Sequence, residues 1–490
     1  MRTLFTSELF DSIIRGIEKE NLRVTNAGKI SDGSHPKVLG HPLTHSYITT
    51  DFAESQLEIV TQPTDSIEKL YSELKSIYEF IFQNLEEETI WPNSMPPAVK
   101  VNEKINIAQY GMNELGQMKT LYRKGLSHRY GSVMQLISGI HYNFSLRKEY
   151  FEKIHPENHR ENLQTFIDEN YFVLITNYLH HAWIFPYLFG ASPICEQSSI
   201  IKKVDYLTIH QKGYAYAQYG TSLRLSDLGY QNKARNLLHV SFIDLNQYIN
   251  SLRLATETKH GEFSKLGMYD GDGQKMQINE NLLQIENEYY APIRPKQPIK
   301  KNERPTAALQ ERGIQYVEVR ALDINPLCPF GLSKDDIRFI ELLLLFFLFN
   351  PAQPIAEKEY LGVLDNINLV ATRGRDPDLE LTTNKSRVKL TELTKKLFEE
   401  IQTFFSTMQL PEEYQSAIQK QYAKILDNNL LPSQQCLNRI EATGQDFTEF
   451  NLQLAAQHKD YFKSLSAADA IKHSEASKKS WDEFQIIERN

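Results

Sequence analysis

The stretch GIEKENLRV, residues 16–24, holds the alternation that decides the fold. In an extended strand, residues two positions apart share a face, so Glu18 and Glu20 project to the same side. Ile17 and Lys19 then point to the other side. We therefore expect a strand here that carries two carboxylates on one face.

The same period of two recurs in other segments. It aligns His141, Asn143 and Ser145 in HYNFSL, then Glu286, Glu288 and Tyr290 in IENEYY, and Glu318 with Arg320 in YVEVR. Apolar residues occupy the alternate positions, as is typical of half-buried strands. The predicted strands are therefore 16–24, 56–60, 140–146, 284–290 and 314–323.

Three further acids lie in TTDFAESQLEIV, residues 49–60. Glu54 and Glu58 are four positions apart and would share one side of either a helix or a strand. Asp51 belongs either with them or in the preceding turn.

Helical periodicity separates these strands. An amphipathic helix is predicted over 65–82, with Asp65 and Glu68 spaced like a capping box. A second is expected over 164–185, ending near Pro186, and a third after Leu332 with Ser333 as its N-cap. Helical spacing then continues from 390 to the end of the chain.

This order of elements lacks regular βαβ alternation, which predicts an α+β protein with an antiparallel sheet flanked by helices and a helical C-terminal extension. No internal repeat is visible in the sequence. We expect one catalytic unit over 1–385, with residues 386–490 packed on it rather than folding independently.

Composition narrows the functional class. The 490 residues carry a formal net charge of -8, which argues against a nucleic-acid-binding protein, since such proteins present basic surfaces. The longest apolar run, 342–349, is far shorter than the ~20 residues that span a membrane. No secretory signal or paired-cysteine motif is present, so we expect a cytoplasmic protein that does not act at membranes.

The aligned carboxylates predict a metal site. Several buried acids on one sheet face would repel one another unless cations neutralise them. Mg²⁺ prefers oxygen ligands and commonly bridges carboxylates to substrate phosphates, and Arg294, Lys296 and Arg320 are candidates to neutralise those phosphates. Nitrogen from His141 would be unusual for Mg²⁺ but acceptable to Mn²⁺.

Each short acidic motif taken alone is more often a solvated or salt-bridged face than a metal site. The sequence lacks the GxxxxGK[ST], GxGxxG and GxSxG motifs of common nucleotide-binding loops and nucleophile elbows. ATP would therefore bind without such a loop.

An ordered set of motifs across residues 12–375 resembles the proteobacterial glutamate-cysteine ligase family. These motifs are GIEKENLRV, LTHSYITTDFAESQLEIVT, LYRKGLSHRYG, SGIHYNFSL, PYLFGASP, AQYGTSLRLSDLGY, LQIENEYYAPIRPK and YVEVRALDINP. The resemblance implies a glutamine-synthetase-like catalytic sheet that binds ATP and Mg²⁺.

The resemblance also implies roles for individual residues. Its metal ligands fall on Glu18, Glu20, Asp51, Glu58, His141 and Glu318, and it gives Glu54, Glu286 and Glu288 no ligand role. Arg320 would contact the transferring phosphoryl group. The residues that would shape a cysteine pocket are Tyr122, Gln135, Arg224, Tyr230 and Tyr290.

The implied reaction joins the γ-carboxylate of L-glutamate to the amine of L-cysteine through γ-glutamyl phosphate, the first step of glutathione biosynthesis. Two alternatives remain: a γ-glutamyl ligase for another amine, and a catalytically inactive nucleotide-binding regulator. We expect glutathione synthetase to be a separate enzyme.

Overall fold

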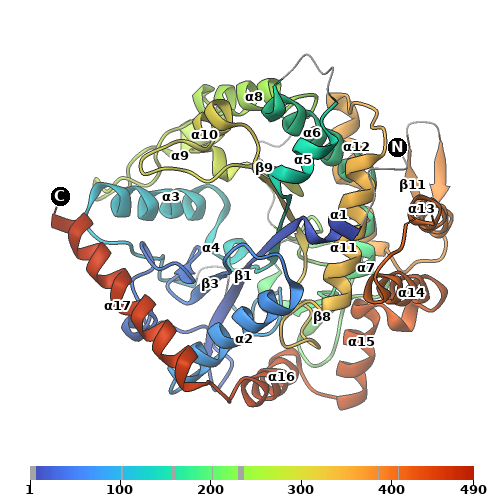
Figure 1. Ribbon diagram of the computed structural model, residues 1–490. Helices are drawn as coiled ribbons and strands as arrows, with labels where there is room; N and C mark the ends of the chain where they lie inside the picture. The colour runs from blue at the N-terminus through green and yellow to red at the C-terminus, as the bar shows by residue number, and fades with distance from the viewer. Residues whose placement is uncertain are drawn as a thin grey trace.

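The computed structural model describes residues 7–100, 103–156, 162–200, 202–229, 237–383, 386–406 and 408–489. Its central feature is an antiparallel sheet, in which β1 and β3 lie near the middle of the molecule (Figure 1). The strand order is β2-β3-β1-β5-β10-β9, and β4 pairs with β1 off this path. The strands are β1 Ile13–Thr25, β2 Ile48–Thr50, β3 Gln56–Val60, β4 Glu88–Ile90, β5 Ile140–Leu146, β9 Ile293–Lys296 and β10 Tyr316–Leu322.

Four of the predicted strands are confirmed, as β1, β3, β5 and β10. The strand predicted over 284–290 is wrong, because this segment forms a short 3-10 turn, η4 Glu286–Glu288. The Glu288 side chain turns back to accept the backbone N–H of Gln284 at 2.6 Å. That bond folds the segment on itself and takes it away from strand pairing.

Helices cover the back of the sheet, the face that holds the odd-numbered residues of β1. α2 Ile67–Gln83 packs against β1, and α6 Leu163–His181 packs against β9 and β10. α11 Lys334–Phe349 reaches the same face through Glu341, which accepts hydrogen bonds from Arg15 of β1 and Tyr142 of β5. The opposite face, with Glu18 and Glu20, is left for the site.

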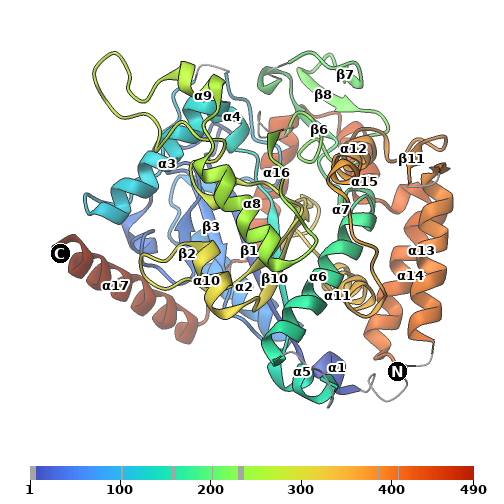
Figure 2. The same cartoon turned by 90° about the horizontal axis from the view of Figure 1, so that it is seen from above.

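The remaining helices before residue 386 lie around the sheet and around the helices that cover its back (Figure 2). They are α1 Ser7–Asp11, α3 Glu114–Tyr130, α4 Ser132–Gln135, α5 Lys148–Ile154, α7 Ile184–Phe189, α8 Leu245–Glu257, α9 Gly261–Leu266, α10 Pro305–Arg312 and α12 Glu357–Arg373. Two small antiparallel sheets complete this part: β6 Ile194–Glu196 with β8 Tyr214–Ala217 and β7 Leu207–Ile209, and β11 Glu380–Thr382 with β12 Arg387–Lys389.

The C-terminal region is helical, as predicted. It comprises α13 Leu390–Phe405, α14 Glu412–Leu426, α15 Pro432–Thr443, α16 Phe447–Tyr461 and α17 Ala467–Arg489, with the 3-10 turn η5 Asn428–Leu430 between α14 and α15. Two other 3-10 turns, η1 Lys37–Leu39 and η2 Gln197–Ser199, lie earlier in the chain. β11 and β12 pair across the boundary predicted after residue 385, which itself lies outside the described residues. The division into 1–385 and 386–490 stays a prediction.

The sequence predicted the N-caps of two helices, and the structure confirms one of them. Ser333 caps α11 in a capping box with Asp336, which confirms the predicted N-cap. The box predicted from Asp65 and Glu68 is wrong by one residue, because Ser66 is the N-cap of α2 and accepts the Lys69 N–H.

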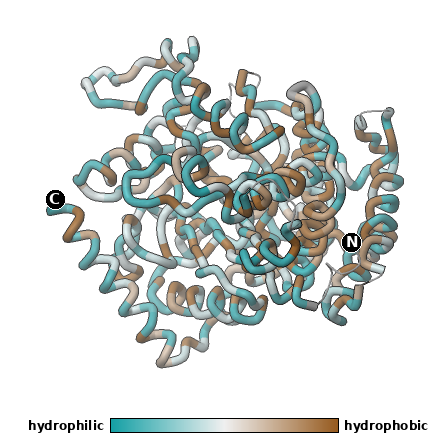
Figure 3. Tube along the Cα trace, turned by 45° about the horizontal axis from the view of Figure 1, so that its top comes forward, coloured by the Kyte–Doolittle hydropathy of each residue, from teal (hydrophilic) through white to brown (hydrophobic). Residues whose placement is uncertain are grey.

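Hydrophobic residues concentrate toward the middle of the molecule, and outlying loops are mainly hydrophilic (Figure 3). The apolar run 342–349 lies in α11, where all but its last residue are buried. Across the described part of the chain, no helix combines the length and apolarity that crossing a bilayer requires. Cys195, Cys328 and Cys436 are free thiols.

Candidate active site

Strand register brings the predicted ligands together on the open face of the sheet. Glu18 of β1 lies opposite His141 of β5, and Glu20 lies opposite Glu58 of β3. Glu318 of β10 lies one row further along, between Asn143 and Arg294. Directly opposed residues in antiparallel pairs have their side chains close together, so pairing concentrates these groups.

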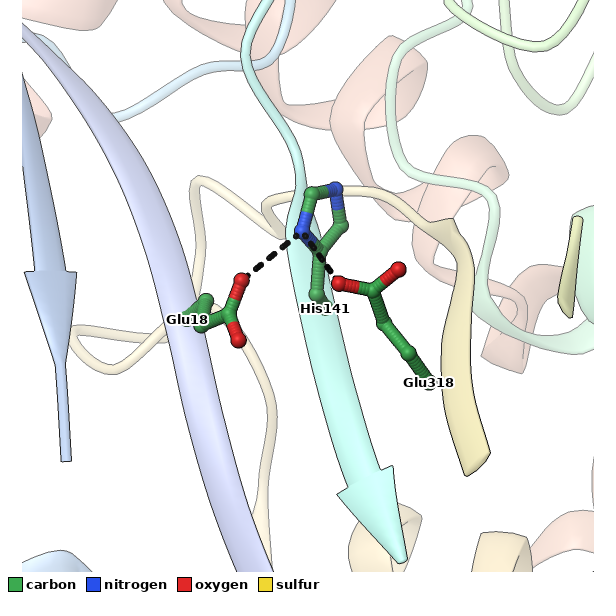
Figure 4. Close-up of side chains that lie close together, drawn as sticks. All are labelled: Glu18, His141 and Glu318. Carbon is green, nitrogen blue, oxygen red and sulfur yellow. Dashed lines mark hydrogen bonds and ion pairs between the residues drawn. The ribbon is translucent and has the colours of Figure 1, made fainter. Parts of the chain in front are cut away.

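Glu18, His141 and Glu318 form the tightest cluster (Figure 4). His141 Nδ1 lies 3.4 Å from Glu18 Oε2 and 3.8 Å from Glu318 Oε1. One ligand atom from each of the three residues lies within 4.8 Å of the others. Glu20 approaches from the other side of the ring, with Oε1 4.0 Å from His141 Nε2.

Burial and like charge raise the pKa of two of these acids. Burial, then the charge of Asp51, raises the pKa of Glu20 to about 8. Burial raises the pKa of Glu58 in the same way, with added repulsion from Asp51 and Glu18. Without cations, this end of the site cannot hold all its carboxylates ionised near neutral pH.

Glu18 and Glu318 behave in the opposite way. Burial would raise the pKa of Glu318, but Lys296 Nζ at 3.2 Å and Arg320 Nη1 at 2.9 Å outweigh it and hold that pKa well below its usual value. Burial would also raise the pKa of Glu18, but the hydrogen bond with His141 and the charge of Lys296 together outweigh burial and lower that pKa. Burial and then Arg320 lower the pKa of His141, so its imidazole is neutral and can donate a lone pair.

These residues fit a divalent cation such as Mg²⁺ or Mn²⁺. The donor set is mostly carboxylate oxygen with one neutral imidazole, a combination open to both metals. Asn143 donates to Glu18 at 2.9 Å, which orients that carboxylate, while its buried Oδ1 has no hydrogen-bond partner among the described residues. A bound cation would also relieve the repulsion at Glu20 and Glu58.

Three basic side chains, carried by β9 and β10, face the acidic residues across the site. Arg294, Lys296 and Arg320 all line the same cavity as the carboxylates. Within the described chain, Nε of Arg294 and Nε of Arg320 are buried and lack hydrogen-bond partners. Unpartnered buried guanidinium donors beside these clustered carboxylates favour an anionic ligand such as a phosphate.

The cavity has a volume of about 1400 Å³ and extends from the sheet to α3, α8 and α10. Every predicted site residue that the structure describes lines it: Glu18, Glu20, Asp51, Glu58, Tyr122, Gln135, His141, Arg224, Tyr290, Arg294, Lys296, Glu318 and Arg320. Tyr230 lies outside the described residues.

Three acids that shared the sequence pattern have structural partners. Glu286 accepts hydrogen bonds from Arg304 at 2.9 Å and Thr306 at 2.8 Å. Glu54 accepts backbone N–H groups of His35 and Gln109, both at 2.6 Å.

Glu288 is held by Tyr130 at 2.6 Å and by Arg129 at 3.2 Å, and both residues of this ion pair are fully buried. Pattern reasoning could not separate these acids from the ligands, because their partners come from distant segments.

Sequence reasoning missed residues of two helices. Lys119 and Arg123 of α3 line the cavity, and the Arg123 guanidinium donates to the Asp51 carbonyl. Their four-residue spacing, which places both on one helix face, is a signal that could have found them. Ile487 and Glu488 of α17 also line the cavity, and we find no sequence signal for that.

The chain is similar to known proteins along most of its length. A profile of the glutamate-cysteine ligase family matches residues 3–370. Glutamate–cysteine ligase of Serratia proteamaculans is 40% identical over 488 residues, 97% of this chain and 93% of that protein. The enzyme of Alcanivorax borkumensis is 38% identical over 94% of this chain and 89% of its own.

Solved structures extend the likeness to three dimensions. A crystal structure of glutamate–cysteine ligase from Francisella tularensis in complex with AMP has a TM-score of 0.92 and 38% identity, covering 98% of this chain and 95% of that one. A bifunctional glutathione synthetase from Pasteurella multocida has a TM-score of 0.75 and 27% identity over 93% of this chain and 53% of its own. The chain therefore belongs to the glutamate-cysteine ligase family.

Proposed function

We propose that this chain catalyses the reaction of its family, ATP-dependent joining of the γ-carboxylate of L-glutamate to the amine of L-cysteine. One observation carries the proposal: clustered carboxylates and His141 face Arg294, Lys296 and Arg320 within a single cavity. Such a pairing suits a reaction that moves a phosphoryl group between anions. The AMP complex of the Francisella tularensis relative supports nucleotide binding.

Glu18, Glu20, Asp51, Glu58, His141 and Glu318 would hold Mg²⁺, or Mn²⁺ in its place. Metal bound there would neutralise charge on phosphate oxygens. Arg320 would stabilise the transferring phosphoryl group, with Arg294 and Lys296 beside it. Glu318 holds both Arg320 and Lys296 by direct ion pairs, and so orients two of these cations.

The proposed chemistry needs no protein nucleophile. The glutamate γ-carboxylate attacks the γ-phosphorus of ATP and ADP leaves, which forms γ-glutamyl phosphate. The cysteine amine then attacks the acyl carbon, loses a proton and displaces phosphate. None of the three cysteines lines the described cavity, and burial raises the pKa of Cys195 and of Cys436 to about 12.

Tyr122, Gln135, Arg224 and Tyr290 would form the pocket for cysteine. Tyrosine rings suit a small thiol-bearing side chain, and Arg224 can bind a carboxylate with two donors. Gln135 Nε2 and Arg224 Nη1 are buried and lack hydrogen-bond partners in the described part of the chain, which supports a polar ligand there. Tyr230 stays part of this prediction.

The proposal is tested by measuring ADP release with each component left out in turn. We expect release to require Mg²⁺, glutamate and cysteine together. A cysteine-stimulated rate that survives without any divalent cation would refute it. If another amine gave a kcat/KM at least ten times that of cysteine, about 1.4 kcal/mol in transition-state binding, the chain would be a ligase for that amine. ATP binding without ADP release would indicate an inactive regulator.

The proposal also covers the enzyme that would use the product and the compartment in which the reaction would occur. A separate glutathione synthetase is the proposed next enzyme, acting on the γ-glutamylcysteine that this reaction would release. The cytoplasm supplies ATP and cysteine in reduced form and is the proposed location.

A further inference from the structure

We propose that Glu488, near the end of α17, is a positioning residue for this active site. It holds the start of α3, and α3 in turn holds the Asp51 segment. The inference rests on the proposed function and adds a residue that lies outside the part of the chain matched by the family profile.

Glu488 binds the chain where α3 begins. Its Oε1 accepts the backbone N–H of Met112 at 2.7 Å, and its Oε2 accepts the backbone N–H and the side-chain amide of Asn113 at 3.0 and 2.6 Å. Asn113 is the N-cap of α3 and accepts the N–H of Gly116 at 2.9 Å. The positive end of the α3 helix dipole also stabilises a carboxylate at this position.

The remainder of α17 fixes where Glu488 sits. The helix runs along the outside of the molecule from α2 toward α3 in both views (Figures 1 and 2). Phe484, one turn before Glu488, stacks on the His41 ring with centroids 3.5 Å apart. Ser480 Oγ accepts the His41 N–H at 2.8 Å, and Trp481 Nε1 donates to the Lys37 carbonyl at 3.0 Å.

Gly111 permits the close approach of the helix to the turn before α3. Its φ is +97°, which favours glycine, and a Cβ there would lie 2.5 Å from Phe484 Cε2 and 2.9 Å from Glu488 Oε2. The turn and the helix end are therefore matched in shape as well as in hydrogen bonding.

The turn and α3 both connect to the site. The Tyr110 hydroxyl contacts the carbonyls of Thr50 and Asp51, at 2.7 and 3.1 Å. The Arg123 guanidinium donates to the Asp51 carbonyl and lies over the Tyr110 ring, 4.6 Å from its centroid. α3 also carries Tyr122 into the cavity. Releasing the start of α3 would therefore loosen the Asp51 segment and one wall of the proposed cysteine pocket.

The test compares Glu488→Ala with Glu483→Ala in the full-length protein. Glu483 is a carboxylate on the same helix that pairs with Lys479 at 3.7 Å and does not line the described cavity, so it is a matched control. For Glu488→Ala, assayed at saturating Mg²⁺ so that a looser Asp51 segment stays metal-bound, we expect the KM for cysteine to rise at least fivefold. We expect kcat to stay within threefold, because Glu318 and Arg320 are untouched. Faster hydrogen exchange is expected over residues 108–126 and 48–52, and Glu483→Ala should match the wild type.

Each outcome decides the question. Unchanged exchange and kinetics would overturn the inference. Faster exchange with unchanged KM would make the contact purely structural, and a raised KM with unchanged exchange would refute the route through α3. Wild-type protein that releases no ADP would instead refute the proposed function, while the exchange measurement still reports on the contact.

Discussion

Glu318 is the residue at which the acidic and basic parts of the site meet. Its side chain is 1% exposed and contacts Lys296, Arg320 and the His141 ring. Because one carboxylate serves all three, its charge state affects both the cation cluster and the proposed metal ligands.

Replacing Glu318 by Gln is expected to lower kcat at least about 100-fold, since removing one preorganised electrostatic group commonly costs that much. The amide keeps the shape of the side chain, so circular dichroism should still show a folded protein. Steady-state ADP release measures the effect, with Glu311→Gln as a control at an exposed ion pair. A near wild-type rate would remove Glu318 from the site.

Glu288 has the same side-chain chemistry but a different role. Its removal in Glu288→Ala should lower the free energy of unfolding by about 3 kcal/mol, because Arg129 would stay buried without its carboxylate. Urea denaturation measures this change. The Mg²⁺ concentration for half-maximal activity should stay within twofold. A large rise in that concentration without loss of stability would show that Glu288 is a metal ligand.

At the scale of elements, α11 illustrates how far local signals reach. Its capping box, Ser333 with Asp336, follows from four consecutive residues and was predictable. Asp336 also accepts a hydrogen bond from Gln421 and pairs with Lys424, both on α14. These contacts tie the C-terminal helices to the start of α11, and no local pattern reports them.

Asp336→Ala should lower the free energy of unfolding at pH 7 by about 1 to 2 kcal/mol, because the hydrogen bonds from Ser333 and Gln421 and the ion pair with Lys424 are lost. Burial would raise the pKa of Asp336, but Lys424 and the bonds from Ser333 outweigh it and hold that pKa below the usual 3.8. The contribution is therefore complete above about pH 4 and is lost as the pH falls through the lowered pKa.

Urea denaturation at pH 7, 5 and 3.5 checks this sign. The difference between wild type and Asp336→Ala should be equal at pH 7 and 5 and smaller at pH 3.5. A difference that already shrinks between pH 7 and 5 would contradict it. Asp335→Ala, at a neighbouring and more exposed ion pair, should cost less than about 1 kcal/mol.

Across the whole molecule, the C-terminal helices share one hydrophobic core with the sheet. Tyr414 of α14 donates to the buried Glu341, which also binds Arg15 of β1. Phe462, just after α16, stacks on Tyr78 of α2 with centroids 4.8 Å apart. Breaking either contact would expose groups on both sides of the predicted boundary.

We therefore expect full-length protein to unfold in one cooperative thermal transition, and residues 386–490 expressed alone to lack stable helical structure. Calorimetry of the whole chain and circular dichroism of the fragment measure these outcomes. Two separated transitions, or a fragment with a cooperative melt of its own, would show that the extension is an independent domain.

The sequence by itself determined β1, β3, β5 and β10 and the face on which their polar groups lie, but it did not predict β9, which carries Arg294 and Lys296. The alternation in GIEKENLRV, HYNFSL and YVEVRAL places Glu18, His141 and Glu318 correctly, because a period of two is a property of neighbouring residues. The family resemblance added Asp51 and Glu58, which alternation left ambiguous.

Only the tertiary structure decided which of these groups meet. The register that sets Glu18 against His141 joins residues 123 positions apart, and the contact of Glu488 with Asn113 joins residues 375 positions apart. It also decided that Glu288 pairs with Arg129 instead of joining the acidic cluster. Such pairings depend on packing between distant segments, whereas periodicity reports only how each segment divides its own side chains between two faces.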